Sequence, residues 1–303
     1  MKSSSLRSLF DYARSLGLQS NEFYWLLDKT TAIKRTRAML RLDSLRIEAD
    51  AAARLRKSID SICKDDKPIQ YELGDVEWFE GELKLVTRPP TLIPRVETEH
   101  WVSKFADMIV MATKGERREH EPFRILDPCC GSGCVGLGLL HLLAKHKYGN
   151  VTVDFVDIKS AAIALARENC LASRPLSNVR FYHQSIFEFA PAQKYDVIAC
   201  NPPYIPLREY ETGLPRQVTK WEDRDALVGG GADDDDGFAF IGDFIRTVRQ
   251  RGWLSDSRSG MMCVEIGSEK QGQMIVSQWG GGAVHKDQYG RDRFAVLHSA
   301  SKQ

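Results

Sequence analysis

The most specific chemistry in this sequence lies in four consecutive residues: Asn201, Pro202, Pro203 and Tyr204. Neither proline has a backbone N–H, and each fixes its own φ near about −65°, so the loop is stiff and its carbonyl oxygens point in set directions. Asn201 adds one side-chain acceptor and two donors, and Tyr204 adds an aromatic face. Rigid acceptors beside an aromatic ring suit the binding of a planar NH2 group. The simpler alternative is a loop that only ends a strand, because Asn and Pro are ordinary turn residues.

The residues around this loop predict the sheet that must position it. The apolar run Val197 to Ala199 precedes the loop and is typical of a strand buried on both faces. We expect strands at residues 123–126, 151–156, 261–267 and 294–297, with helices at 135–144 and 160–170. This alternation predicts an α/β domain with a parallel sheet and helices on both faces, whose ligands bind at the carboxyl ends of the strands.

A glycine-containing turn after the first of these strands predicts a cofactor loop. It runs through Asp127, Pro128, Cys129, Cys130, Gly131, Ser132 and Gly133. Cys129 stands at the first glycine position of a GxGxxG pattern, and no Walker lysine follows, so a pyrophosphate cradle is disfavoured. Asp127 is an awkward neighbour for a phosphate but a good one for a cationic sulfonium or an amino group.

Asp157 stands at the end of the next strand, where a carboxylate can accept both ribose hydroxyls of an adenosine. Its alternative role is to cap the helix 160–170. The turn, Asp157 and the loop at Asn201 follow one another on successive strand ends, which favours the cofactor role. An adenosine pocket with an acid at the loop predicts S-adenosylmethionine. We expect no metal, because the nearby cysteines lack the paired spacing of a zinc site.

The chain before this domain has a different pattern of apolar residues. Residues 1–66 carry helical periodicity and predict a small bundle, whose arginines form either a solvated surface or a docking face for a bulky acidic partner. Residues 67–96 contain two alternating runs about a glycine-containing turn, which predicts a β-hairpin linker. Residues 97–303 then form the main domain, beginning with a helix from Glu97 to Ala112.

The composition is that of an ordinary globular protein. The 303 residues are 43% apolar and 27% charged, and this length favours two domains. No run of about 18 apolar residues occurs, so we expect no membrane span. The formal charge of +1 gives no electrostatic argument for nucleic acid as the main partner.

Cysteine usage and the N-terminus bear on the compartment. Seven cysteines make an odd count, and most fall in expected interior elements, which is typical of reduced thiols. The segment Met1 to Phe10 is serine-rich, with two cations and no acid, and faintly resembles a mitochondrial presequence. The alternative is that it caps the first helix of the bundle, and the two roles are compatible.

Several motifs together resemble the HemK/PrmC family of glutamine N5-methyltransferases, and the resemblance covers nearly the whole chain. The motifs are Asp127–Gly133, Asp157, Asn201–Tyr204, Ile93–Glu99 and Gly290–Arg293. The resemblance implies a Rossmann-like class I methyltransferase sheet after a substrate-docking bundle and a hairpin. It also implies methylation of the glutamine in the Gly-Gly-Gln loop of a peptide-chain release factor. With the basic N-terminus, the divergence resembles the eukaryotic mitochondrial branch, hence the matrix.

The same resemblance implies residue roles. Substrate binding and catalysis would fall to Asn201, Pro202, Pro203 and Tyr204. The cofactor would be bound by Asp127, Cys129, Cys130, Gly131, Ser132, Gly133, Asp157, Ser185, Ile186 and Asn201. Two of these positions depart from the family pattern: Cys129 replaces a usual glycine, and Ser185 replaces the acid that often binds the adenine amino group.

Two other functions stay open at this point. The Asn-Pro-Pro-Tyr element is shared with adenine and cytosine amino-methyltransferases, so a nucleic-acid base is an alternative substrate. The departures at Cys129 and Ser185 allow a catalytically weak methyltransferase-like binding or assembly factor. We expect a monomer without stable nucleic-acid binding.

Overall fold

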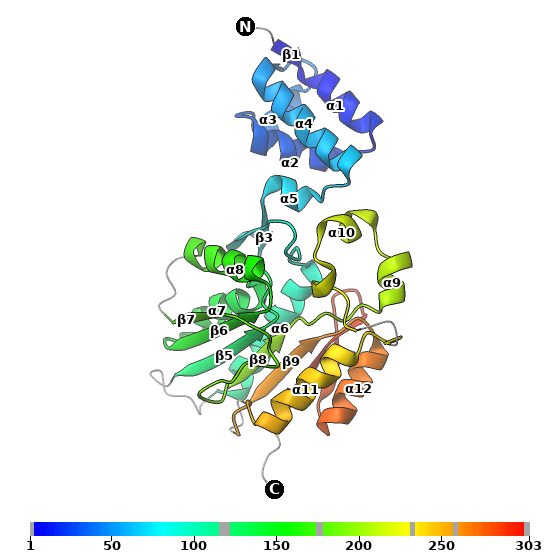
Figure 1. Cartoon of the computed structure of the whole chain (residues 1–303). Coiled ribbons are helices and arrows are strands. Elements are labelled where there is room, and N and C mark those ends of the chain that lie inside the picture. Colours follow the sequence, from blue (N-terminus) through cyan, green and yellow to red (C-terminus); the bar gives the residue numbers. More distant parts are fainter. Residues whose placement is uncertain (1–2, 115–121, 174–177, 231–233, 257–259, 300–303) are drawn as a thin grey trace. The chain divides into compact units, whose positions relative to one another are not determined.

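The computed structural model describes residues 3–114, 122–173, 178–230, 234–256 and 260–299 (Figure 1). Of the predicted presequence-like segment, Met1 and Lys2 therefore lie outside the described residues. The chain forms two compact units. One joins Met1–Asp75 to Pro215–Trp221, and the other joins Val76–Leu214 to Glu222–Gln303. The domain limits at residues 66 and 96 stay a prediction.

Helices fill the first unit. They are α1 (Leu6–Ser15), α2 (Ser20–Thr30), α3 (Arg35–Arg41), α4 (Ala49–Asp65), α5 (Ile69–Leu73) and α10 (Arg216–Trp221). Apolar side chains at helical spacing form its core, with Leu6, Phe23 and Leu55 fully buried. A short antiparallel pair, β1 (Ser3–Ser5) with β2 (Arg46–Glu48), was not predicted from the sequence.

The second unit contains the main sheet. Its strands in the described residues are β5 (Phe123–Pro128), β6 (Val151–Asp157), β7 (Val179–His183), β8 (Val197–Cys200), β9 (Met261–Glu265), β10 (Ala283–Lys286) and β11 (Asp292–His298). The order is β10-β11-β9-β8-β5-β6-β7. β11 runs antiparallel to both of its neighbours, so the expectation of a wholly parallel sheet is wrong there. The physical reason is that a short turn, not a crossover helix, joins β10 to β11.

Helices cover both faces of this sheet, as predicted (Figure 1). α6 (Val96–Ala112), α7 (Cys134–Lys145) and α8 (Ser160–Ala172) pack on one face, and α11 (Ala239–Arg251) and α12 (Glu269–Trp279) on the other. Successive strand residues alternate between the two cores, as Ile125 and Leu126 do. Both faces of the sheet are buried by helices, and this explains the uninterrupted apolar runs of the strands in the sequence.

Smaller elements complete the second unit. They are the hairpin strands β3 (Asp75–Trp78) and β4 (Leu83–Val86), the helix α9 (Leu207–Thr212) and the 3-10 turn η1 (Arg224–Ala226). No helix within the described ranges is long and apolar enough to cross a membrane. The same ranges hold no group of three or more His, Cys, Asp or Glu side chains arranged for a metal ion.

Candidate active site

A cavity of about 220 Å³ lies in the second unit at the carboxyl ends of β5, β6, β7 and β8. The predicted site residues that line it are Cys129, Gly131, Asp157, Ser185, Ile186, Asn201 and Pro203. Parallel strands end at one edge of a sheet, and this brings their terminal loops together. The sequence-predicted loops therefore share one cavity.

The remaining predicted residues do not line the cavity. They are Asp127, Cys130, Ser132, Gly133, Pro202 and Tyr204. Cavity residues that no sequence motif indicated include Thr91, Lys159 and Phe240. Their segments carry no local pattern that marks a binding site.

Asp157 organises one end of the cavity through hydrogen bonds to the neighbouring backbone. Its Oδ2 accepts the backbone N–H of Gly131 at 2.9 Å, and its Oδ1 accepts that of Lys159 at 2.9 Å. Lys159, not Asp157, is the N-cap residue of α8, so Asp157 braces the turn before the helix. Each carboxylate oxygen keeps capacity for a further donor, as two ribose hydroxyls require. Burial raises the pKa of Asp157, and the two backbone bonds oppose that rise.

Asp127 lies fully buried beneath the loop. Its Oδ2 accepts the Gly136 N–H at 2.8 Å, whereas its Oδ1 has no hydrogen-bond partner among the described residues. Burial raises the pKa of Asp127 well above its ordinary value. A buried carboxylate with an unpaired oxygen favours a cationic neighbour. The residues present therefore fit a cofactor with a sulfonium and an amino group.

Cys129 occupies the glycine-like position with φ of 57°, in the left-handed region. A non-glycine residue there costs about 1–3 kcal/mol, which the surrounding loop must offset. The neighbouring backbone is fixed by the bond from Cys130 N–H to the Val156 carbonyl at 3.1 Å. Burial raises the pKa of Cys134 to about 12, so this thiol stays protonated.

The loop Asn201–Tyr204 is braced by backbone and side chains from three later segments. Gln271 Nε2 donates to the Tyr204 carbonyl at 2.8 Å, and Gln271 Oε1 accepts the Gly267 N–H at 2.8 Å. A Cβ added at Gly267 would lie 2.9 Å from the Tyr204 ring, and one at Gly237 would overlap the Tyr204 carbonyl oxygen. Close backbone approach thus holds this loop in place.

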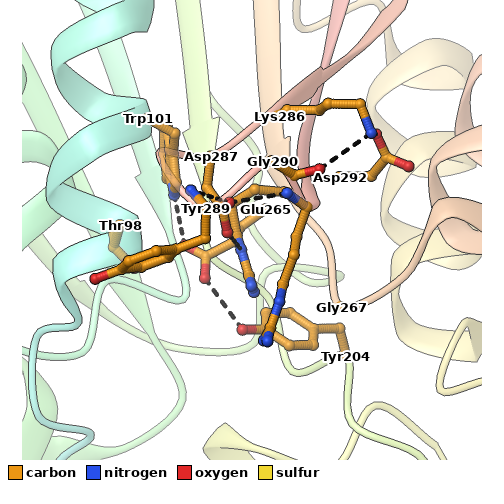
Figure 2. Close-up of polar contacts among 12 residues, drawn as sticks. Thr98, Trp101, Tyr204, Glu265, Gly267, Lys286, Asp287, Tyr289, Gly290 and Asp292 are labelled. Carbon is orange, nitrogen blue, oxygen red and sulfur yellow. Dashed lines mark hydrogen bonds and ion pairs between the residues drawn. The ribbon is translucent and has the colours of Figure 1, made fainter.

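Glu265, at the end of β9, is a buried carboxylate that the sequence analysis missed. Its Oε2 accepts the Thr98 hydroxyl at 2.7 Å and the Trp101 indole N–H at 2.5 Å, while its Oε1 accepts the Tyr204 hydroxyl at 3.1 Å (Figure 2). Burial raises the pKa of Glu265, and these donors with Arg293 oppose the rise. An acid inside the apolar run of β9 was a usable signal, because a buried charge requires partners.

The opposite wall of the cavity comes from two segments, residues 90–92 and 223–226. The Asp223 N–H donates to the Pro90 carbonyl at 2.7 Å and ties the segments together. Lys159 Nζ lies 2.7 Å from Asp225 Oδ2 and 3.3 Å from Asp223 Oδ2, which links this wall to the start of α8. The cavity is therefore walled by segments far apart in the chain.

Comparison with known proteins agrees with this architecture. A family profile described as "Methyltransferase small domain" matches residues 115–224. The solved catalytic domain of hMettl16, in complex with the MAT2A 3'UTR hairpin 6, has a TM-score of 0.50 at 13% identity and covers 86% of this chain and 84% of its own. Fold and site together define a class I S-adenosylmethionine-dependent methyltransferase, which confirms the predicted fold class.

Sequence relatives narrow the class. The release factor glutamine methyltransferase of Haemophilus influenzae is 32% identical over 257 residues, covering 83% of this chain and 80% of the relative. That of Fusobacterium nucleatum is 31% identical over 264 residues, 86% of this chain and 68% of the relative. The "Probable MRF1 mitochondrial N(5)-glutamine methyltransferase mtq1" of Schizosaccharomyces pombe is 29% identical over 235 residues, 74% and 72% of the two chains. This chain belongs to the release factor glutamine methyltransferase family, as its motifs indicated.

Proposed function

We propose that this protein transfers a methyl group from S-adenosylmethionine to the side-chain amide nitrogen of the glutamine in the Gly-Gly-Gln motif of a peptide-chain release factor. The observation that carries the proposal is the braced Asn201–Tyr204 loop beside a cavity that also presents Asp157. Membership of the family supplies the substrate class.

The first step is to hold the substrate amide. An amide nitrogen is a poor nucleophile because its lone pair is delocalised into the carbonyl. The Asn201 Oδ1 and the Pro202 carbonyl oxygen would accept its two N–H groups, and within the described residues neither oxygen accepts a hydrogen bond. Tyr204 would pack on the flat amide or the methyl donor. Positioning of this kind can contribute about 7–11 kcal/mol to lowering the barrier.

The cofactor site follows from the other end of the cavity. Asp157 would accept the ribose hydroxyls, and Ser185 and Ile186 would contact the adenine. Asp127, which lies buried beneath the loop with one unpaired oxygen, would support the cationic end of the cofactor from behind the cavity lining. When bound, S-adenosylmethionine supplies an electrophilic methyl group. The residues of this chain bind, orient and exclude water. No base with an unusual pKa is required, because the proton can leave after transfer.

We assign the first unit to docking of the bulky substrate. Its support is helix α3, which exposes three arginines, Arg35, Arg37 and Arg41, together with two apolar residues, Met39 and Leu40, that are 59% and 85% exposed. We also place the protein in the mitochondrial matrix and expect a monomer. Support for the compartment comes from two relatives, one of Schizosaccharomyces pombe and one of Saccharomyces cerevisiae, whose names include "mitochondrial". Size-exclusion chromatography and imaging of a tagged chain test these two points.

The decisive experiment is mass spectrometry of a recombinant mitochondrial release factor after incubation with this protein and S-adenosylmethionine. We expect one added methyl on the glutamine of Gly-Gly-Gln, and none when that glutamine is replaced by alanine. No methyl, with cofactor binding measured by calorimetry, would indicate another amide or amino substrate. Absence of cofactor binding would favour a binding factor, and steeply salt-dependent binding to nucleic acid would favour a base methyltransferase.

A further inference from the structure

We infer that Glu265 is a positioning residue, which acts through the Thr98 hydroxyl to fix the orientation of the Asn201 carboxamide. The inference rests on the proposed function, in which Asn201 must present an acceptor to the substrate amide. The contact with Thr98 explains why the Asn201 Oδ1 acceptor, and not the Asn201 NH2 group, faces the substrate.

The residues of this network come from α6, the end of β9 and the loop after β8. Thr98 and Trp101 lie one turn apart on α6, and Glu265 ends β9. Thr98 is 1% exposed, Trp101 is fully buried and Glu265 is 1% exposed, so water is absent from their contacts. Asn201 Nδ2 lies 3.4 Å from the same Thr98 Oγ1 that bonds Glu265. Thr98 is therefore the only residue among these that touches both Glu265 and Asn201.

The hydrogen-bond direction follows from the chemistry of each group. An indole N–H can only donate, so Glu265 Oε2 must accept from Trp101. Thr98 gives its single hydroxyl hydrogen to the same oxygen, which leaves only lone pairs on Thr98 Oγ1. Those lone pairs can accept an N–H but cannot donate to a carbonyl. Asn201 must then turn Nδ2 toward Thr98 and Oδ1 away from it.

A buried carboxylate needs compensation, and Arg293 near the start of β11 supplies it. Arg293 is a cation with 14% of its side chain exposed, and it acts electrostatically on Glu265. Asp287 holds Arg293 at 3.1 Å and accepts the backbone N–H of Arg291 at 3.0 Å. Asp287 also accepts the backbone N–H of Tyr289 at 2.9 Å (Figure 2). Asp287 in the turn therefore holds the Arg293 cation in place, and the charge of Arg293 favours the acceptor form of Glu265.

The consequence is a site of fixed polarity. With Oδ1 directed away from Thr98, Asn201 offers an acceptor to a substrate NH2 group. The reversed carboxamide would bring N–H against N–H, which forfeits the hydrogen bond and repels the substrate. Tyr204 is tied to the same carboxylate through its hydroxyl, so one buried acid fixes two residues of the loop.

The test begins with an activity-independent readout, hydrogen exchange of the Asn201 side-chain NH2 in protein labelled with ¹⁵N-asparagine. The Asn201→Ala variant assigns the signal by its loss. We expect slow exchange in the wild type and fast exchange in Thr98→Val, which keeps the shape but removes the acceptor. Thr98→Ser restores slow exchange. We expect fast exchange in Glu265→Met, which removes the acceptor for Thr98. Glu265→Gln restores slow exchange, because its side-chain oxygen can still accept from the Trp101 indole N–H and from Thr98.

Kinetics give the second readout. We expect Thr98→Val to lower kcat about tenfold, the equivalent of one hydrogen bond of about 1.4 kcal/mol, with the S-adenosylmethionine Kd unchanged by calorimetry. Thr98→Ser recovers the lost activity. Thr113→Val is the matched control, because it removes a buried threonine hydroxyl bonded to Ile109 at the far end of the same helix.

The outcomes separate the two hypotheses. Slow exchange persisting in Thr98→Val, or equal loss in Thr98→Ser and Thr98→Val, overturns the positioning role. A wild type that methylates no glutamine overturns the proposed function, and the exchange data alone then decide whether Thr98 and Glu265 orient Asn201. Thermal unfolding of every variant guards against loss of fold.

Discussion

Arg95 and Glu222 lie 127 residues apart in the sequence, yet Nη2 of Arg95 is 2.7 Å from both carboxylate oxygens of Glu222. The same carboxylate accepts the Ile93 N–H at 3.2 Å. Because the residues just before Ile93 and just after Glu222 line the cavity, this pair holds one wall of the cavity together.

Glu222→Gln tests that function of the pair. The Glu222 side chain is 1% exposed but Arg95 is 33% exposed, so we expect unfolding in urea to show a loss of about 2 kcal/mol, below the 3–5 kcal/mol of fully buried pairs. Glu168→Gln is the control, because its bidentate pair with Arg88 is exposed and should cost at most about 1 kcal/mol. Equal losses would show that the pair does not stabilise the wall.

Gly237→Ala should disrupt the loop at Tyr204. The φ of Gly237 is 63°, and the added Cβ would overlap the Tyr204 carbonyl oxygen. Gly252→Ala is matched in backbone strain, with φ of 61°, but its Cβ would meet open space. Both should lose about 1 kcal/mol for the left-handed conformation, and only Gly237→Ala should also lose methylation. Similar activity in both variants would contradict close packing of the loop.

Asn201→Ala should abolish methylation while S-adenosylmethionine binding stays largely intact, because the proposed role of Asn201 is to hold the substrate amide. Asp157→Asn should have the opposite effect: it should weaken cofactor binding and leave kcat unchanged at saturating cofactor. The reason is that one of the two carboxylate oxygens is lost as an acceptor. Calorimetry and single-turnover assays measure the two quantities. Near wild-type turnover by Asn201→Ala would contradict the proposal that Asn201 holds the substrate amide.

Cofactor binding should shield one cysteine from alkylation. Cys129 and Cys63 are half-buried, whereas the other cysteines are buried. Cys129 lines the cavity and Cys63 lies in the first unit. We expect S-adenosylhomocysteine to slow iodoacetamide labelling of Cys129 and to leave that of Cys63 unchanged, as followed by peptide mass spectrometry. Equal labelling of Cys129 with and without the ligand would place the cofactor elsewhere.

Asp127 should leave a pH signature on stability. Burial raises its folded pKa, so above about pH 4 the folded state binds its proton more tightly than the unfolded state. Stability from this group therefore falls as pH rises toward the folded pKa. Asp127→Asn lacks that proton, and its stability relative to wild type should grow by up to about 1.4 kcal/mol per pH unit over this range. Urea unfolding of the cofactor-free proteins measures the difference.

Local patterns in the sequence were sufficient to predict much of the fold and of the cavity in the second unit. The apolar run of β8 predicted a buried strand, and the order of loop, acid and Asn201 predicted which loops meet at one sheet edge. These predictions succeed because a parallel sheet brings all carboxyl ends to the same edge regardless of loop length. Glu265 was also within reach, since an acid in an apolar strand needs partners.

Other features depend on contacts that no local pattern encodes. β1 consists of three serines with little strand propensity, and its pairing is set by β2 more than forty residues later. The direction of β11 follows from the turn at Asp287. Thr91 and Phe240 reach the cavity from segments without a motif, so only the assembled fold identifies them.

The close packing around Tyr204 decides where entropy is lost when a substrate binds. Gly237, Gly267 and Gln271 already immobilise the loop during folding, so it has little freedom left to surrender on association. For the Gly-Gly-Gln substrate proposed above, the loss would then fall on the substrate, because glycine has the most backbone freedom to lose. Association would therefore be governed by how rigidly the release factor presents its glutamine before the two proteins meet.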